Sequence, residues 1–184
     1  MSVTTETGLV EIRWHARAGQ GAKTAAQLLA LALLRSGRSV QAFPEYGPER
    51  RGAPLRAYTR VSPLPIRRHD SIEEPDLVVV LEPSLLGEVD VLEGLAPDGI
   101  LLLNGEAPPP ELADCADVRC VPATRIAHEH GSSFANVVMT GAVAALLREP
   151  PLEELQTAAA ELLVAKGGAA SVREAIAEGH AWLR

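Results

Sequence analysis

The spacing of apolar and polar residues changes along the first part of the chain. Residues 9–14 read LVEIRW, in which apolar and charged side chains alternate as in a strand with one covered face. Residues 22–36, AKTAAQLLALALLRS, contain neither proline nor glycine and stop at Gly37, which is typical of a helix and its C-terminal end. The chain therefore opens with a strand, a glycine-containing turn and a helix.

Later apolar runs predict further strands at residues 39–43, 55–61, 76–81, 100–103 and 118–121. Segment 55–61 places Leu, Ala, Thr and Val on one face and Arg56, Tyr58 and Arg60 on the other, so we expect it to be half solvated or at an interface. Segments 76–81 (DLVVVL) and 100–103 are continuously apolar, as in strands that are covered on both faces. A parallel sheet is the natural place for such strands.

Three more helices are predicted in the C-terminal half of the chain. One covers residues 133–148 with Ser132 or Ser133 as its N-cap, one covers 150–166 and stops at Gly167, and one runs from Ser171 toward Trp182. Strands that alternate with helices indicate a single α/β domain over residues 1–184, with a polar tail at 1–8. We expect a three-layer α/β/α domain with an open, mostly parallel, Rossmann-like sheet and helices on both sides.

Composition and charge narrow the class of protein. The 184 residues are 47% hydrophobic but only 3% aromatic, so the core must consist mainly of Leu, Val and Ala. A formal net charge of -7 argues against nucleic acid or an anionic membrane as the main partner. No signal-peptide pattern and no apolar run of about 18 residues is present, so a cytoplasmic location is expected. We expect Cys115 and Cys120 to be reduced core thiols.

A glycine loop, HARAGQGAKT at residues 15–24, joins the first strand to the first helix. It fits neither the dinucleotide fingerprint, because Thr24 stands where the third small residue belongs, nor the P-loop pattern, because the required glycines are missing. Two interpretations stay open: a tight turn that allows close helix packing, or an anion site at the helix N-terminus. The candidate anion-binding residues are Gly19, Gln20, Gly21 and Lys23, with Arg17 nearby.

A second candidate is the loop at residues 44–54, PEYGPERRGAP, which we call the proline loop. Its prolines fix the backbone and lower the entropy lost on ordering. Arg50 and Arg51 offer planar donors suited to carboxylates or phosphates, and Glu45 and Glu49 could hold them by pairing. The alternative is an exposed charge cluster that is paired only with itself.

Other polar residues carry weaker signals. His128 and His130 have the spacing of metal ligands, but no third ligand is close in sequence, so we expect solvated side chains near a helix end. Glu82 follows a buried strand at the position where α/β folds place ligand-binding groups. Asn136 lies at the start of a predicted helix, where it could serve packing or an interface.

Four segments of the chain, in this order and spacing, resemble one enzyme family. GQGAKTAAQLLA, FPEYGPERRGAP, EPDLVVVLEPSLL and NVVMTGA are similar to the gamma subunit or gamma domain of 2-oxoacid:acceptor oxidoreductases, typified by pyruvate:ferredoxin oxidoreductase. The resemblance covers roughly residues 10–147, and the proline loop is its most specific part. The family usually opens the glycine loop with Gly-Arg-Gly-Gly-Gln-Gly, whereas Ala16 and Ala18 replace two of those glycines here.

The resemblance implies oxidative decarboxylation of a 2-oxoacid such as pyruvate to an acyl-CoA, with thiamine diphosphate and iron–sulfur clusters passing electrons to ferredoxin. Two cysteines cannot hold a cubane cluster, and the sequence has no GDG segment followed by NN of the kind that binds thiamine diphosphate. These cofactors are therefore expected on partner chains: an alpha subunit, a thiamine-diphosphate-binding beta subunit and a ferredoxin-like delta subunit. We expect no catalytic residue and no metal on this chain, and no activity of the chain alone.

In that setting, the proline loop is interpreted as a rigid surface that docks beside the cofactor-bearing subunit or contacts an anion. The residues assigned to it are Glu45, Tyr46, Gly47, Glu49, Arg50, Arg51 and Gly52, together with Asn136. Three alternatives stay open: a free-standing nucleotide- or phosphate-binding Rossmann-like protein, a purely structural interaction module, and a homodimer formed through the arginine pair.

Overall fold

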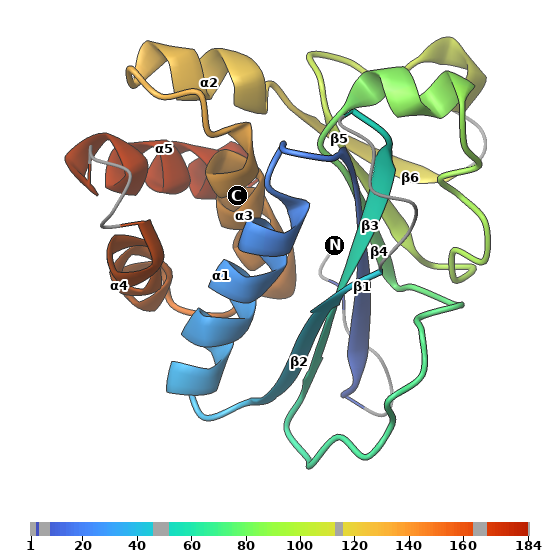
Figure 1. Ribbon diagram of the computed structural model, residues 1–184, viewed down its shortest axis with the longest axis horizontal. Coiled ribbons are helices and arrows are strands. Elements are labelled where there is room, and N and C mark those ends of the chain that lie inside the picture. The colour runs from blue at the N-terminus through green and yellow to red at the C-terminus, as the bar shows by residue number, and fades with distance from the viewer. Residues whose placement is uncertain (1–2, 4–7, 46–51, 113–115, 164–168, 184) are drawn as a thin grey trace.

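The computed structural model describes residues 3, 8–45, 52–112, 116–163 and 169–183 (Figure 1). Its centre is a six-stranded sheet in the order β2-β3-β1-β4-β5-β6. Strands β1, β4, β5 and β6 run parallel to one another, whereas β3 is antiparallel to both β1 and β2. The strands span β1 Val10–Arg17, β2 Ser39–Pro44, β3 Pro54–Ser62, β4 Leu77–Val80, β5 Ile100–Asn104 and β6 Asp117–Val121.

The helices lie on one side of this sheet in Figure 1. They are α1 Ala22–Arg35, α2 Ala123–Glu129, α3 Ala135–Leu147, α4 Leu152–Leu163 and α5 Ala169–Trp182. The opposite side carries the short 3₁₀ helices η1 Pro83–Gly87 and η2 Pro110–Leu112 and the loops around them. No helix in the described ranges is long and apolar enough to cross a bilayer.

The predicted α/β class and the parallel central strands are confirmed. One detail differs, because the outer layer opposite the α-helices consists of η1 and the turns after it rather than of long helices. The connection from β4 to β5 contains Pro83, Gly87, Gly94 and Pro97, and these residues limit it to a single short 3₁₀ helix.

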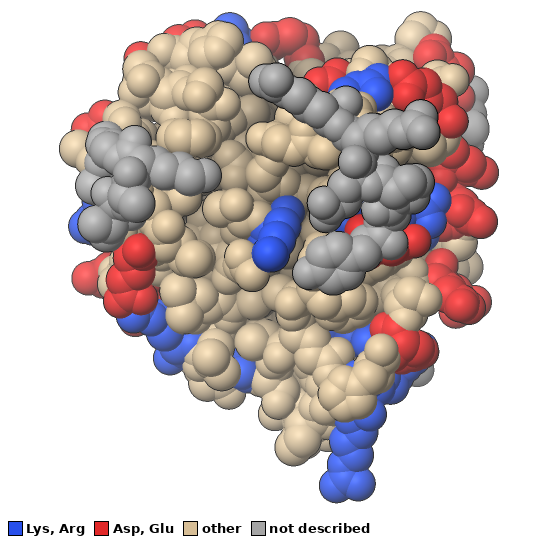
Figure 2. Space-filling model, viewed as in Figure 1, with Lys and Arg blue, Asp and Glu red and all other residues tan. Residues whose placement is uncertain are grey.

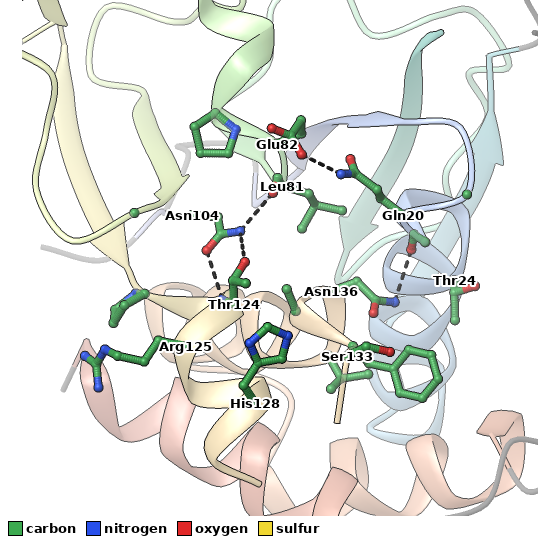
Figure 3. A pocket seen from close by; sticks show the side chains of 18 of the residues that line it. Gln20, Thr24, Leu81, Glu82, Asn104, Thr124, Arg125, His128, Ser133 and Asn136 are labelled. Carbon is green, nitrogen blue, oxygen red and sulfur yellow. Dashed lines mark hydrogen bonds between the residues drawn. The ribbon is translucent and has the colours of Figure 1, made fainter. Parts of the chain in front are cut away.

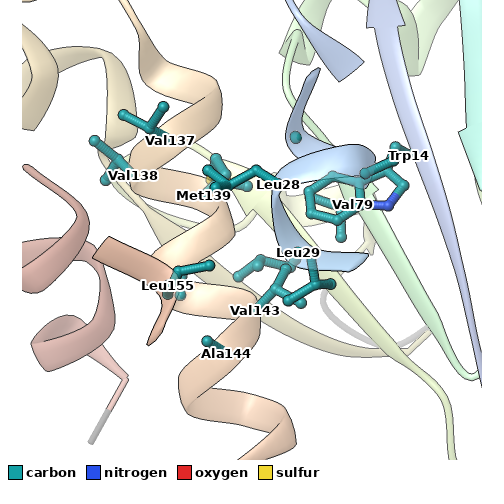
Figure 4. Packing of buried hydrophobic residues seen from close by; sticks show 14 of the residues in the cluster. Trp14, Leu28, Leu29, Val79, Val137, Val138, Met139, Val143, Ala144 and Leu155 are labelled. Carbon is teal, nitrogen blue, oxygen red and sulfur yellow. The ribbon is translucent and has the colours of Figure 1, made fainter. Parts of the chain in front are cut away.

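The main core lies between the helices and the sheet (Figure 4). Leu28 and Leu29 of α1 pack with Met139 and Val143 of α3, and Trp14 of β1 belongs to the same cluster. Helix α3 is apolar on nearly all sides, which is the pattern of a helix that is buried all round. It contacts α1, α2, α4 and α5, so it is the central helix of this layer.

The second face of the sheet has an apolar half and a polar half. Strands β4 and β5 direct Val78, Val80, Leu101 and Leu103 into a small cluster under residues 86–95. On β1 and β3 the same face carries buried charged residues instead, among them Arg13 and Arg60.

Strand β3 was expected to be half solvated or at an interface, and the expectation of half solvation is wrong. Arg60 is 0% exposed and Tyr58 is 3% exposed. The guanidinium of Arg60 donates to Glu11 at 2.6 Å and to Gln41, Asp70 and the Ser71 carbonyl at 3.3 Å each. Alternation of charged and apolar residues did not reveal that the loop from β3 to β4 covers this face.

The start of α3 also differs from its prediction, and α2 was not predicted. Helix α3 begins at Ala135 with Phe134 at the N-cap position and no side-chain cap, whereas Ser132 Oγ accepts from the Phe134 N–H at 3.1 Å. Residues 123–129 form α2, a helix of 7 residues that follows Pro122.

Cys120 on β6 is half-buried rather than part of the core, and Cys115 lies outside the described residues.

Candidate functional site

A cavity of about 880 Å³ lies where the carboxyl ends of the central strands meet the first turns of α1 and α3 (Figure 3). In an α/β fold, this end of the sheet is where ligands bind. The polar residues that line the cavity come from the glycine loop and α1, from the end of β5 and the segments that follow β4 and β5, and from α2, α3 and the turn between them: Gln20, Thr24, Glu82, Asn104, Glu106, Thr124, Arg125, His128, Glu129, Ser133 and Asn136.

The glycine loop owes its shape to Gly19 and Gly21, which have φ angles of +99° and +86°. Gly21 is the N-cap of α1 in a left-handed conformation, and a Cβ atom there would lie 2.7 Å from Asn136 Nδ2. Asn136 Nδ2 donates to the Gly21 carbonyl at 3.3 Å. The first turns of α1 and α3 are therefore joined directly, through the candidate residues Gly21 and Asn136.

Neither of these helix starts has a side-chain cap. Gly21 offers no side chain to α1, and the side chain of Phe134 has no hydrogen-bond acceptor for α3, although the Phe134 carbonyl accepts from the Val137 N–H at 3.1 Å. Since the first N–H groups of a helix have no partner within the helix, both first turns can donate to a ligand in the cavity. The helix dipoles add partial positive charge at the same place.

A hydrogen-bond chain fixes the rim of the cavity beside the glycine loop. Gln20 accepts from the Arg17 N–H at 2.8 Å and donates to Glu82 Oε2 at 2.5 Å. The other carboxylate oxygen of Glu82 accepts from the Ser84 N–H at 3.2 Å. Burial acts to raise the pKa of Glu82, but the hydrogen bonds from Gln20 and Ser84 together with the charge of Arg17 outweigh it and lower that pKa.

Two basic residues of the glycine-loop region do not face the cavity as the anion interpretation expected. Arg17 donates to Ser84 Oγ at 2.9 Å and to the Gly52 carbonyl at 3.1 Å, and it forms an ion pair with Glu88. Lys23 is exposed on α1 and is not among the residues that line the cavity. An anion would therefore be held here mainly by backbone N–H groups.

The opposite wall of the cavity was not predicted from the sequence. Asn104, at the end of β5, donates to the Leu81 carbonyl and to Thr124 Oγ1, both at 2.9 Å, and accepts from the Thr124 N–H at 3.2 Å. These bonds hold the start of α2 against the ends of β4 and β5. An asparagine that closes the apolar run ILLLN was the available signal.

Charged side chains of α2 complete the lining. Arg125 lies 3.0 Å from both Glu106 and Glu129, and its guanidinium stands over the Trp182 ring at 5.6 Å from the centroid. His128 is exposed at the cavity, whereas His130 lies away from it and pairs with Glu178 at 2.7 Å. Within the described ranges, no group of at least three His, Cys, Asp or Glu side chains is placed to hold a metal ion.

Comparison with known proteins identifies the family. A model of the pyruvate ferredoxin/flavodoxin oxidoreductase family matches residues 11–182. The chain belongs to this family. It is 46% identical over 156 residues to the pyruvate/ketoisovalerate oxidoreductases common subunit gamma of Pyrococcus abyssi, covering 82% of this chain and 84% of that one. The predicted resemblance is confirmed, and the chain is a gamma subunit of a 2-oxoacid oxidoreductase complex.

Solved structures in the family share the fold. Pyruvate oxidoreductase subunit PORC from Thermotoga maritima superposes with a TM-score of 0.81 at 36% identity, covering 95% of this chain and 96% of that one. A 2-oxoglutarate:ferredoxin oxidoreductase from Magnetococcus marinus, solved with 2-oxoglutarate, coenzyme A and succinyl-CoA bound, gives a TM-score of 0.78 at 20% identity. This chain matches 31% of that longer chain over 97% of its own length, and the likeness shows the fold alone.

The ends of the proline loop of this gamma subunit are held on β3 at one side and on the glycine loop at the other. Glu45 donates its N–H to the Arg56 carbonyl at 3.0 Å, and its carboxylate accepts from the Tyr58 hydroxyl. At the other end, Gly52 accepts from Arg17, and Ala53 accepts from the Ala18 N–H at 2.9 Å. The other assigned residues, Tyr46, Gly47, Glu49, Arg50 and Arg51, lie outside the described residues.

Proposed function

We propose that this gamma subunit works in a cytoplasmic complex that oxidatively decarboxylates a 2-oxoacid such as pyruvate to an acyl-CoA and passes the electrons to ferredoxin. Thiamine diphosphate and the iron–sulfur clusters belong to its alpha, beta and delta partners, and this chain serves assembly and binding. One observation carries the proposal: the cavity and both ends of the proline loop lie at the same end of the sheet.

The cavity is the proposed site for CoA or for an anionic part of it. Its volume of about 880 Å³ falls in the range of small-molecule and cofactor sites. Gly19 and Gly21 keep side chains away from the loop backbone, and the uncapped first turns of α1 and α3 supply N–H donors. Gln20 and Asn136 lie at the rim and hold these donors in place.

The proline loop is the proposed docking surface, with Arg50 and Arg51 contacting a carboxylate or phosphate at the partner subunit. Support comes from its described ends, which are anchored by Glu45, Tyr58 and Arg17. In Figure 2 acidic side chains lie mainly around the rim of this view, whereas a basic side chain stands among uncharged residues at its centre.

Reconstitution tests the assembly role. The complex is assembled from separately expressed subunits with wild-type gamma chain or with Arg50→Ala plus Arg51→Ala. We expect the double variant to assemble at least tenfold more weakly, since each lost bidentate contact is worth about 1.5–3 kcal/mol. Unchanged assembly, or oxidation of a 2-oxoacid by the gamma chain alone, would contradict the proposal.

Titration calorimetry on the isolated chain separates this function from that of a free-standing nucleotide-binding protein. The gamma-subunit function allows weak binding of CoA and predicts no binding of ATP or NAD. Micromolar binding of ATP or NAD by the chain alone would favour the nucleotide-binding alternative.

A further inference from the structure

The carboxylates that line the cavity are of two kinds. Glu106 and Glu129 each lie 3.0 Å from the guanidinium of Arg125, so that their charges are paired. Glu82 has no ion pair with a lysine or arginine in the described part of the chain. Its hydrogen-bond partners are the neutral amide of Gln20 and the backbone N–H of Ser84, and Arg17 acts on it only through its nearby charge.

Glu82 is held in place and ionised, but it is not saturated with donors. Gln20 and Ser84 each donate to a different oxygen of the carboxylate, and a carboxylate offers about four acceptor positions. These hydrogen bonds and the nearby charge of Arg17 lower its pKa despite burial, so it remains charged at neutral pH. Glu82 can therefore accept further hydrogen bonds from a ligand.

Asn136 adds a second acceptor to the same cavity (Figure 3). The residue is 5% exposed, and its Nδ2 atom is bound to the Gly21 carbonyl. That bond decides which end of the amide is the donor, because an oxygen facing the carbonyl would be repelled. The Oδ1 atom is then left as an acceptor, with no donor bonded to it within the described ranges.

We propose that Glu82, with Asn136 Oδ1 as a second acceptor, binds the hydroxyl or N–H groups of an uncharged part of the ligand, so that a phosphate of the ligand lies on the backbone N–H groups of the first turns of α1 and α3 and not against the Glu82 carboxylate. This assignment rests on the proposed function of the cavity as the CoA site, and it gives Glu82 and Asn136 a role in that binding. In CoA, the matching donors are found in the pantetheine arm and in the adenosine. A phosphate beside an unpaired carboxylate would meet like charge in a partly buried place.

One substitution tests this assignment by whether it weakens or strengthens the binding of CoA. In the reconstituted complex, Glu82→Gln is expected to raise the Kd and the KM for CoA about tenfold, because hydrogen bonds to a charged acceptor contribute more than those to a neutral one. Saturating CoA should restore turnover. Glu129→Gln is the matched control, since its carboxylate is already paired with Arg125, and its effect should be several-fold smaller. Tighter CoA binding by Glu82→Gln would show a phosphate at Glu82 and overturn the proposal.

Fragment competition distinguishes the two sources of donors. Pantetheine and adenosine 3′,5′-bisphosphate are tested as inhibitors of CoA binding in the wild-type and Glu82→Gln complexes. The fragment whose inhibition constant rises in the variant is the one that contacts Glu82. If both fragments compete and neither constant changes, the assignment is wrong.

A cavity-filling variant separates failure of this inference from failure of the proposed function. His128 is exposed at the cavity, so His128→Trp should fill space without disturbing the core. If His128→Trp weakens CoA binding and Glu82→Gln does not, the cavity binds CoA but the role of Glu82 is wrong. If neither changes CoA binding, the cavity is not the CoA site. Weaker subunit assembly by Glu82→Gln with unchanged CoA affinity would point to a basic side chain of a partner and also overturn the proposal.

Discussion

Arg60 is a fully buried cation whose charge is balanced by Glu11 at 2.6 Å and by Asp70 at 3.3 Å. Replacing it by methionine would leave the 8% exposed Glu11 buried without its main partner. We expect Arg60→Met to lower the free energy of unfolding by about 3 kcal/mol, measured by urea denaturation. Arg67→Met at an exposed position of the following loop is the control and should change stability by less than about 0.5 kcal/mol. Equal effects of the two substitutions would contradict this account of Arg60.

His130 connects the end of α2 to α5. Its hydrogen bond to Glu178 and the nearby charge of Glu174 raise its pKa in the folded state. A raised pKa means that folding favours the protonated form, so the stabilisation is complete below the unfolded value of about 6.5 and is lost as the pH rises through the folded value. His130→Gln should therefore lower the Tm at pH 5.5, by an amount corresponding to at most about 1 kcal/mol for this partly exposed pair, and have little effect at pH 9.

The control for His130 is His128→Gln. No ion pair of His128 is found among the described residues, and its side chain is exposed. The Tm difference between this variant and the wild type should be nearly the same at both pH values. A pH-independent effect of His130→Gln would show that the contact with Glu178 is only a neutral hydrogen bond.

At the scale of elements, the sequence predicted those helices and strands that are determined by the pattern of neighbouring residues. Helix α1 is Ala- and Leu-rich, stops before Gly37 and was placed within one residue; β4 and β5 were recognised from their continuous apolar runs. Helix α2 was missed because a helix of 7 residues spans only two turns and shows little periodicity. The exposure of β3 was misjudged because the acceptors of the Arg60 hydrogen bonds, such as Glu11 and the Ser71 carbonyl, lie on other segments of the chain.

The crossing of α3 and α5 depends on two glycines. A Cβ atom on Gly141 would overlap the Ile176 carbonyl oxygen, and one on Gly179 would overlap the carbonyl oxygen of Val138. Gly141→Ala should lower the free energy of unfolding by about 2 kcal/mol, although alanine favours helix formation, because the helices must move apart. Gln27→Ala on the exposed face of α1 should stay within about 0.5 kcal/mol of wild type in the same urea experiment. A neutral or stabilising Gly141→Ala would mean that the two helices can separate at no cost.

At the scale of the whole molecule, the candidate site could be predicted only in part. The glycine loop, Glu82 and Asn136 were singled out from local sequence, and they line one cavity. The wall formed by Asn104 and Thr124 was not, because hydrogen bonds between a strand end and a helix 20 residues later leave no local pattern. The docking role of the proline loop stays a prediction, since most of its residues lie outside the described ones.

The two faces of the sheet differ in how firmly they are covered. The helical face has the large core, whereas the opposite layer, residues 86–95, rests on a small apolar cluster and on Arg13. Arg13 donates to the carbonyls of Val91 at 3.1 Å and Glu93 at 2.5 Å, and its Nε donates to His15 at 3.0 Å. Burial and the nearby Arg13 and Arg56 lower the pKa of His15 to about 3, so it is a neutral acceptor.

This asymmetry predicts that the second layer opens separately from the rest of the molecule. In native-state hydrogen exchange, Arg13→Met should lower the protection of amides in residues 88–95 at least tenfold, because one buried and one partly buried carbonyl lose their donor. Protection in α1 and α3 should fall much less. Arg56→Met is the control, since Arg56 is one-third exposed and only 3.4 Å from Glu93. Equal loss of protection in all segments of the Arg13 variant would show that both layers unfold as one unit.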